Sequence, residues 1–229
     1  PFREVIVPAM VVFGVLAATL LGIPDPLVNA RENGVFRSYK INGVPSTSIL
    51  LIPAQFVPPT LQECGQRGLK AAIIGSGGFR ETGPQGAALE VECLDIARSY
   101  GMRLIGPNVL GIIDTVCKLN ASFAAGMPRR GKIAFMSQSG ALCTSILDMA
   151  LGQGIGFSRF YSIGNKADIN ELDLITTWAQ DDETRAIMAY LEGITKGPEF
   201  IRMASEVTRH KPIIAIKSGT TSAGSQAVS

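Results

Sequence analysis

The chain has 229 residues, a formal net charge of +2 and 46% hydrophobic residues, which is enough for one large domain or two domains of ordinary size, each with its own core. Only 17% of the residues are charged. The composition therefore excludes intrinsic disorder as the default and provides no basic stripe that could neutralise a nucleic-acid backbone. We expect a folded protein with no nucleic-acid partner.

The first residues include an apolar run that raises the question of a membrane. Val5–Ile23 is 19 residues long and contains no charge, which is long enough for a spanning helix. Pro8, Gly14 and Gly22 interrupt it, and its β-branched first half resembles a buried parallel strand that leads into a packed helix. A signal peptide is another possibility, although residues 1–4 supply only a weak basic start. Because the rest of the chain has an α/β pattern, we favour a soluble protein without a membrane partner.

Beyond residue 49, short apolar runs alternate regularly with amphipathic stretches. Strands are expected at residues 48–54, 69–75, 102–106, 132–137, 157–163, 184–192 and 211–217. Helices are expected at residues 59–67, 86–100, 141–153, 171–181 and 199–209. Strands separated by helices of this length pair in parallel through right-handed crossovers, so the pattern predicts an α/β fold with parallel sheets.

This alternation breaks down in a polar stretch between Ile113 and Gly131, which contains glycine, proline and two adjacent arginines. We interpret the stretch as a domain boundary. The prediction is a first α/β unit at residues 1–118 and a second at residues 125–229, both within ordinary domain size.

The cysteines and the single histidine limit the chemistry. The cysteines are too far apart for a zinc knuckle or a redox Cys-x-x-Cys pair, so we expect reduced thiols in a cytoplasmic protein; they are Cys64, Cys93, Cys117 and Cys143. Histidine-dependent nucleophilic catalysis or a histidine-rich metal site would rest on His210 alone. No metal site is expected in this chain.

Ligands of open parallel sheets bind beyond the carboxyl ends of the strands, so the loops after the strands are the candidate sites. Gly77 and Gly78 follow one strand and would let the backbone approach a ligand closely. Asn108 follows another strand in a Pro-Asn turn. Each of these loops, taken alone, could be no more than a turn.

The sharpest local signal is a strand, a Ser-x-Ser-Gly turn and a helix. Such a junction directs free amides and the positive end of a helix dipole at one point, which suits a phosphate, and its candidate ligands are Ser137, Ser139 and Gly140. A serine-hydrolase elbow would look similar, but the residues do not form Gly-x-Ser-x-Gly. Ser139 could also be an ordinary helix N-cap.

Two further polar turns follow strands. Glu192 comes directly after an apolar strand, where its carboxylate could hold an imidazole in one tautomer or be a solvated strand end. Residues 164–168 (GNKAD) follow the preceding strand and could line the same crevice.

Seven motifs in order are far more specific than any one of these loops. They are IPAQFVPP, GFRETG, MRLIGPNVLGII, SQSGAL, SIGNKAD, YLEGI and KPIIAIKSG. Over residues 45–229 the chain resembles the NDP-forming acyl-CoA synthetases, especially ADP-forming acetyl-CoA synthetase, and more distantly the α subunit of succinyl-CoA synthetase.

The resemblance implies a CoA-binding Rossmann-like domain followed by a flavodoxin-like ligase domain. It also implies that acyl-CoA and phosphate form an acyl phosphate, whose phosphoryl group passes to a histidine and then to a nucleoside diphosphate. The nucleotide and Mg²⁺ would be bound by a nucleotide-grasp domain, either farther along the same chain or on a β subunit. An oligomer is expected.

The matching positions imply specific roles. Phosphate would be held by Ser137, Ser139 and Gly140, and Glu192 would orient the phosphorylated histidine. CoA would be contacted by Arg31, Pro53, Ser76, Gly77, Gly78 and Asn108.

Two features depart from the family's pattern. The family's phosphorylated histidine follows the KSG segment, but Ser229 is reached before any such residue, and His210 precedes the last strand. The phosphate loop expected after the first strand is also missing. We expect the sequence to omit segments at its start, in its first loop and at its end.

Two other functions are compatible with the fold pattern. A non-catalytic CoA-sensing module of a lysine acetyltransferase would share the CoA loops and would tolerate loss of the histidine. A nicotinamide-dependent oxidoreductase would need an intact Gly-x-Gly-x-x-Gly with a downstream acid, which the chain lacks. The sequence does not specify the acyl group or decide between ADP and GDP.

Overall fold

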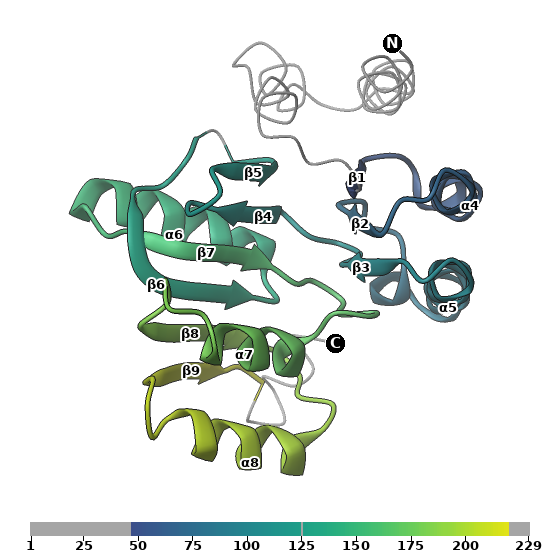
Figure 1. Cartoon of the computed structure of the whole chain (residues 1–229). Coiled ribbons are helices and arrows are strands. Elements are labelled where there is room, and N and C mark those ends of the chain that lie inside the picture. The colour runs from purple at the N-terminus through teal and green to yellow at the C-terminus, as the bar shows by residue number, and fades with distance from the viewer. Residues whose placement is uncertain (1–46, 125, 220–229) are drawn as a thin grey trace.

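The computed structural model describes residues 47–124 and 126–219, which form two sheets flanked by helices (Figure 1). Arg31 and the apolar run Val5–Ile23 lie outside these residues. Within the described ranges, no helix has both the length and the apolar character needed to cross a membrane. The expected α/β fold with parallel sheets is confirmed.

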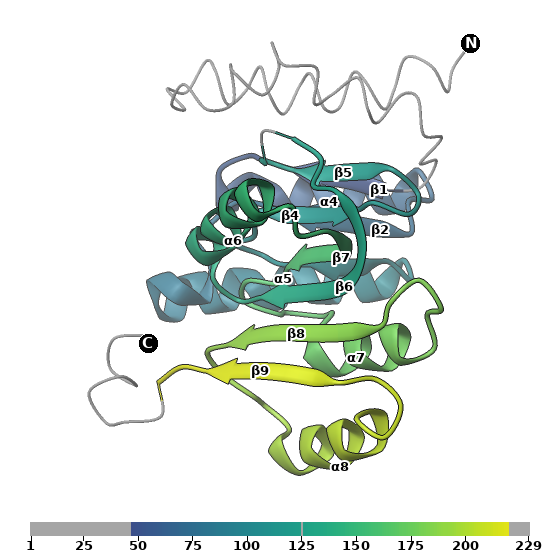
Figure 2. The same cartoon turned by 90° about the vertical axis from the view of Figure 1, so that its left-hand side faces the viewer.

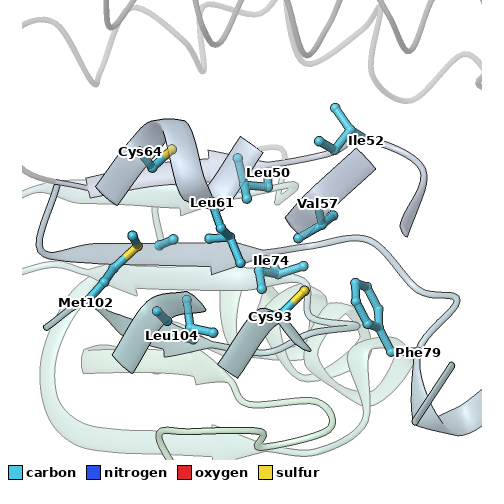
Figure 3. Close-up of a cluster of buried hydrophobic side chains, with 12 residues drawn as sticks. Leu50, Ile52, Val57, Leu61, Cys64, Ile74, Phe79, Cys93, Met102 and Leu104 are labelled. Carbon is cyan, nitrogen blue, oxygen red and sulfur yellow. The ribbon is translucent and has the colours of Figure 1, made fainter. Parts of the chain in front are cut away.

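The first sheet has three parallel strands in the order β1-β2-β3. Its elements are β1 (Thr47–Leu50), η1 (Ala54–Phe56), α4 (Val57–Gln66), β2 (Ala71–Ile74), η2 (Arg80–Thr82), α5 (Pro84–Ser99) and β3 (Arg103–Ile105). Side chains alternate between the two faces of a strand. Ile74 therefore packs against α4 and α5 in the cluster of Figure 3, whereas its neighbour Ile73 faces the second sheet.

The second sheet has six strands in the order β5-β4-β7-β6-β8-β9. Its elements are β4 (Gly111–Asp114), β5 (Leu119–Ser122), β6 (Arg130–Ser137), α6 (Gly140–Gln153), β7 (Phe157–Ser162), α7 (Glu171–Ala179), β8 (Ala186–Leu191), α8 (Gly197–Val207) and β9 (Ile213–Lys217). Phe135 packs with residues of α6 on one face, and Met136 packs with residues of α7 on the other. Figures 1 and 2 show these two helices on opposite sides of the sheet.

The hairpin formed by β4 and β5 differs from the sequence expectation. These strands lie across residues 111–122, where a polar boundary was expected, and they pair antiparallel with each other, while β4 also pairs antiparallel with β7. The turn forms because the Asp114 carboxylate accepts hydrogen bonds from the amides of Val116 and Cys117, at 2.9 and 3.0 Å. The hairpin thus belongs to the second sheet, although the proposed first unit extended to residue 118. The division into domains stays a prediction.

The loop after β7 connects the two sheets. Asp168 accepts hydrogen bonds from the side chain of Arg103 and the amide of Leu104, both at 2.8 Å. The amide of Ala167 donates to the carbonyl of Gly106 at 3.0 Å. The carboxyl ends of β3 and β7 are therefore held next to each other, which brings the loops of the two sheets together.

None of the four cysteines, all of which lie in the described ranges, forms a disulfide; Cys64, Cys93 and Cys143 are buried and Cys117 is exposed. Burial raises the pKa of Cys93 to about 12, with a further contribution from the nearby charges of Glu92 and Glu90, and it raises the pKa of Cys143 to about 11. These two thiols therefore stay protonated at neutral pH, which makes them unreactive core residues.

Candidate functional site

A cavity of about 510 Å³ lies at the carboxyl edge of the second sheet, among the loops that follow β3, β6 and β8. Four residues singled out from the sequence meet there: Asn108, Ser139, Gly140 and Glu192. The other lining residues are Val109, Leu110, Gln138, Ala141 and Thr144. His210 precedes β9, which is parallel to β8, so it lies beyond the opposite edge of the sheet.

The N-terminus of α6 forms one wall of the cavity. Ser139 is the N-cap, and its hydroxyl accepts a hydrogen bond from the amide of Leu142 at 3.3 Å. The first amides of a helix lack intrahelical partners, so this wall presents donors and the positive end of the helix dipole. The Ser139 side chain uses only one amide of the first turn, so its role as N-cap does not exclude an anion at this position.

Ser137 does not line the cavity. It is fully buried, and its hydroxyl accepts from the amide of Ser139 at 3.0 Å and donates to the carbonyl of the same residue at 2.9 Å. The Ser137 side chain therefore stabilises the turn and does not face the cavity.

The turn that carries Glu192 is held from three directions. Gln138 Oε1 accepts from the amides of Glu192 and Gly193, at 2.8 and 3.0 Å. The Lys166 ammonium donates to the Gly193 carbonyl at 2.6 Å, and the Lys217 ammonium donates to the Glu192 carbonyl at 2.8 Å. Within the described part of the chain, the Glu192 carboxylate forms no hydrogen bond or ion pair. The backbone is thus fixed while the carboxylate stays available to a ligand.

Lys166 is itself fixed by a buried ion pair. Its ammonium lies 2.8 Å from Glu171 Oε2, and the two side chains are 4% and 3% exposed. Sequence reasoning missed the roles of Lys166 and Gln138, although both residues stand inside motifs that it singled out.

The residues expected to bind CoA that lie in the described ranges gather at the carboxyl end of the first sheet. The Ser76 hydroxyl donates to the carbonyl of Ile52 at 2.5 Å and accepts from its amide at 3.1 Å, which ties the loop after β2 to the loop after β1. Pro53 follows Ile52 and begins η1. Glu81 Oε1 accepts from the amide of Gly78 at 2.6 Å. The Glu81 carboxylate therefore already accepts the hydrogen bond that this backbone amide of the glycine loop could otherwise donate to an anion.

Asn108 connects the two sets of residues. Its amide donates to the Ser76 carbonyl at 2.9 Å, and its side chain lies near Gly77, where an added Cβ would be 3.5 Å from Asn108 Oδ1. The same residue lines the cavity with Ser139 and Glu192. Its backbone is in the left-handed region at a φ of 61°, which asparagine tolerates better than most residues. The glycine loop and the cavity are therefore contiguous.

Asn165 secures the first sheet to the loop after β7. Its side-chain amide donates to Glu81 Oε2 at 2.6 Å and to Glu90 Oε2 at 2.8 Å, and its carbonyl accepts from the Arg80 guanidinium. Burial alone would raise the pKa of Glu81. Hydrogen bonds from Asn165 and from the amides of Gly78 and Phe79 outweigh burial, so the pKa lies below its usual value.

At neutral pH, the free energy of unfolding of an Asn165→Asp variant should be about 2 kcal/mol or more below that of the wild-type protein. The reason is that a third carboxylate would replace the amide donor that bridges two carboxylates. Repulsion between like charges raises the pKa of the clustered carboxyl groups in the folded variant. The loss of stability is therefore present above those pKa values and becomes smaller as the pH falls through them. Wild-type Glu81 has a lowered pKa, and its contribution to stability is lost as the pH falls below about 4.5. The difference in free energy of unfolding between the wild-type protein and the variant should therefore become smaller at acidic pH.

Urea unfolding of the wild-type protein and the variant between neutral pH and about pH 4 would measure this difference in free energy of unfolding. Asn170→Asp is the matched control, because Asn170 caps α7 and aspartate is an equally good N-cap. Equal stabilities of the Asn165→Asp variant and the control would contradict the bridging role of Asn165.

Comparison with known proteins gives two adjacent family matches. Residues 27–115 match the CoA binding domain family, and residues 130–229 match the succinyl-CoA ligase like flavodoxin domain family. The order of the matches agrees with the expected Rossmann-like and flavodoxin-like domains.

Two similar relatives are named as ligases. The α subunit of acetate–CoA ligase [ADP-forming] II from Pyrococcus furiosus is 44% identical over 87% of this chain and 45% of its own length. The 4-hydroxybutyrate–CoA ligase [ADP-forming] of Nitrosopumilus maritimus is 39% identical over 90% of this chain and 31% of its own length. This chain therefore spans less than half the length of either relative.

A solved structure agrees with these relatives. The dinucleotide forming acetyl-coenzyme A synthetase 1 of Ca. Korarchaeum cryptofilum, in complex with phosphate and ADP, superposes with a TM-score of 0.76 at 39% identity. The match covers 82% of this chain and 41% of that chain.

Proposed function

Because this chain belongs to the NDP-forming acyl-CoA synthetase family, we propose that it is the part of such an enzyme that binds acyl-CoA and phosphate and converts them to an acyl phosphate and CoA. One observation carries the proposal. Asn108 adjoins Gly77 in the glycine loop and also lines the cavity with Ser139, Gly140 and Glu192, so a thioester that passes the loop would reach a phosphate in the cavity.

The placement of CoA follows from the charges of the loops. Glu81 already occupies the amides of Gly78 and Phe79, so this loop suits the uncharged pantetheine arm better than a phosphate. Gly77 has no side chain, so we place the pantetheine arm beside its backbone, near Glu81 and Asn108. The pyrophosphate of CoA would lie toward the start of the chain, with Arg31 and Pro53 among its contacts.

The chemistry proceeds by two transfers. A phosphate oxygen held at the N-terminus of α6 attacks the thioester carbonyl; the C–O bond forms, the C–S bond breaks, and CoA leaves as its thiol after protonation. A histidine supplied by another part of the complete protein then attacks the phosphorus, the P–O bond breaks, and the acid leaves. Glu192 accepts a hydrogen bond from the other imidazole nitrogen and so fixes its tautomer and orientation.

The remaining steps need parts that lie outside this chain. A nucleotide-grasp domain or β subunit would bind the nucleotide and Mg²⁺ and receive the phosphoryl group, in an oligomeric cytoplasmic enzyme. Among the described residues, no three histidine, cysteine or acidic side chains are arranged to hold a metal ion. The relatives reported above are ligases, and no observation favours the CoA-sensing alternative.

The test is turnover by the complete protein together with its nucleotide-grasp partner. We expect ATP to form from ADP and phosphate only when an acyl-CoA is present, with release of one CoA for each ATP. A panel of short acyl-CoA substrates would identify the acyl group. Failure of every acyl-CoA in the panel to support ATP formation would refute the proposal.

Gly77→Leu should weaken CoA binding about tenfold or more, because a bulky side chain would fill the path of the pantetheine arm at a cost of at least about 1.4 kcal/mol. An added Cβ would already lie 3.2 Å from Glu81 Oε1. Gly152→Leu is the control, since nothing lies within 4 Å of a Cβ added at that position in α6. Isothermal titration calorimetry with CoA measures the difference, and unchanged affinity in the Gly77 variant would count against this placement.

A further inference from the structure

The side-chain amide of Gln138 has a fixed orientation. Gln138 Oε1 accepts hydrogen bonds from two backbone amides, those of Glu192 and Gly193. An amide nitrogen cannot accept from an N–H group, so the oxygen must face the turn and the NH₂ group must face away from it. The position of the NH₂ group is therefore set by the backbone of β8 and its turn.

This NH₂ group is available to a ligand. Gln138 lines the cavity and is only partly buried, and Nε2 has no hydrogen-bond partner among the described residues. The hydroxyl of the neighbouring Ser139 accepts from the amide of Leu142 as N-cap, and its own O–H remains able to donate. Gln138 is thus a side-chain donor that faces the cavity without a partner, next to a carboxylate that would otherwise repel an anion.

We propose that Gln138 Nε2 donates a hydrogen bond to a phosphoryl oxygen held at the N-terminus of α6, while Oε1 keeps the Glu192 turn in place. This assignment rests on the proposed function, and it gives Gln138 a direct role in binding phosphate. The Gln138 side chain also fixes the distance between the bound phosphoryl group and the backbone of Glu192. The residue therefore counters the negative charge of Glu192 where the anion approaches it.

Gln138→Met tests the donor without adding a charge. It should raise the KM for phosphate about tenfold, the effect expected for loss of one hydrogen bond to a charged group, with CoA affinity unchanged. The complete protein and its nucleotide-grasp partner are used, at saturating acyl-CoA and ADP. A wild-type KM for phosphate in this variant would overturn the assignment.

Gln138→Glu tests the same atom in a variant that retains the turn. A carboxylate still accepts from both backbone amides, but it presents a negative oxygen to phosphate, so the KM should rise about tenfold to a hundredfold at neutral pH. The increase should shrink as the pH falls, because a protonated carboxyl group can donate. A merely structural role would not produce this pH dependence, and a ratio of variant to wild-type KM that does not change with pH would contradict the proposal.

Gln153→Glu is the matched control, with the same change of charge at the opposite end of α6. It should keep the wild-type KM for phosphate, and thermal unfolding should confirm that all three variants are folded. The proposed function and the assignment of Gln138 can be tested separately. Lack of acyl-CoA-dependent turnover in the wild-type enzyme would refute the proposed function, whereas turnover with an unchanged phosphate KM in both Gln138 variants would refute this assignment alone.

Discussion

Glu192→Gln should reduce phosphoenzyme formation by about a hundredfold or more, because removal of a carboxylate that orients an imidazole costs about ten- to a hundredfold and the loss of its charge also destabilises the imidazolium formed during transfer. The change removes one negative charge and leaves the backbone of the turn unaltered, since Gln138, Lys166 and Lys217 hold that backbone through main-chain atoms. CoA binding should be retained, because the loops that we propose to bind CoA lie at the first sheet.

Incorporation of radiolabelled phosphate into the complete enzyme measures this effect. Glu206→Gln is the control, since Glu206 is exposed on α8 and forms no ion pair within the described part of the chain. Normal labelling of the Glu192 variant would mean that its carboxylate is merely the solvated end of a strand.

Gly164→Ala should destabilise the protein by about 3 kcal/mol or more and disrupt the cavity, because it combines backbone strain with a severe overlap. The φ of Gly164 is +49°, and an added Cβ would lie 2.3 Å from the carbonyl oxygens of both Pro107 and Asn108. The loop after β3 would have to move, and with it Asn108, which adjoins both Gly77 and the cavity. Loss of acyl-CoA-dependent turnover should therefore accompany the loss of stability.

Two alanine controls separate the contributions in thermal or urea unfolding. Gly101 has a φ of +62° with nothing within 4 Å of an added Cβ, so Gly101→Ala reports backbone strain alone. Gly152 lies in α6 with open space around it, so Gly152→Ala should be neutral or slightly stabilising. A Gly164→Ala variant no less stable than the Gly101→Ala variant would show that the close packing of Gly164 against the loop after β3 does not contribute to stability.

The α/β architecture was predictable because two periodicities alternate along the chain. Apolar strands such as 132–137 and helices such as 141–153 appear within a residue or two of the expected positions. The hairpin of β4 and β5 was not predictable in this way, because each strand has only four residues and β5 (Leu119–Ser122) is half polar. Its register depends on the Asp114 turn and on pairing with β7, which is distant in sequence.

The meeting of Ser139 and Glu192 was predictable, because both follow parallel strands of one sheet and so lie at its carboxyl edge. The inward direction of Ser137 was not, since Ser137 is the last residue of β6 and the sequence alone does not show where the strand ends and the turn begins. Gln138 was missed for a similar reason. Its function depends on which atom faces the turn of β8, and only the three-dimensional contact between two loops determines that.

The proposed mechanism requires that phosphate attacks the thioester of an acyl-CoA in the cavity and that the resulting acyl phosphate transfers its phosphoryl group. The direct measurement uses phosphate labelled with heavy oxygen at every position, the complete protein with its nucleotide-grasp partner, ADP and an acyl-CoA, and mass analysis of the acid at early times. The bridging oxygen of the acyl phosphate comes from phosphate and remains with the carboxyl group when the P–O bond breaks. We expect one heavy oxygen in the carboxyl group of the released acid for each ATP formed; formation of ATP with unlabelled acid would contradict this mechanism.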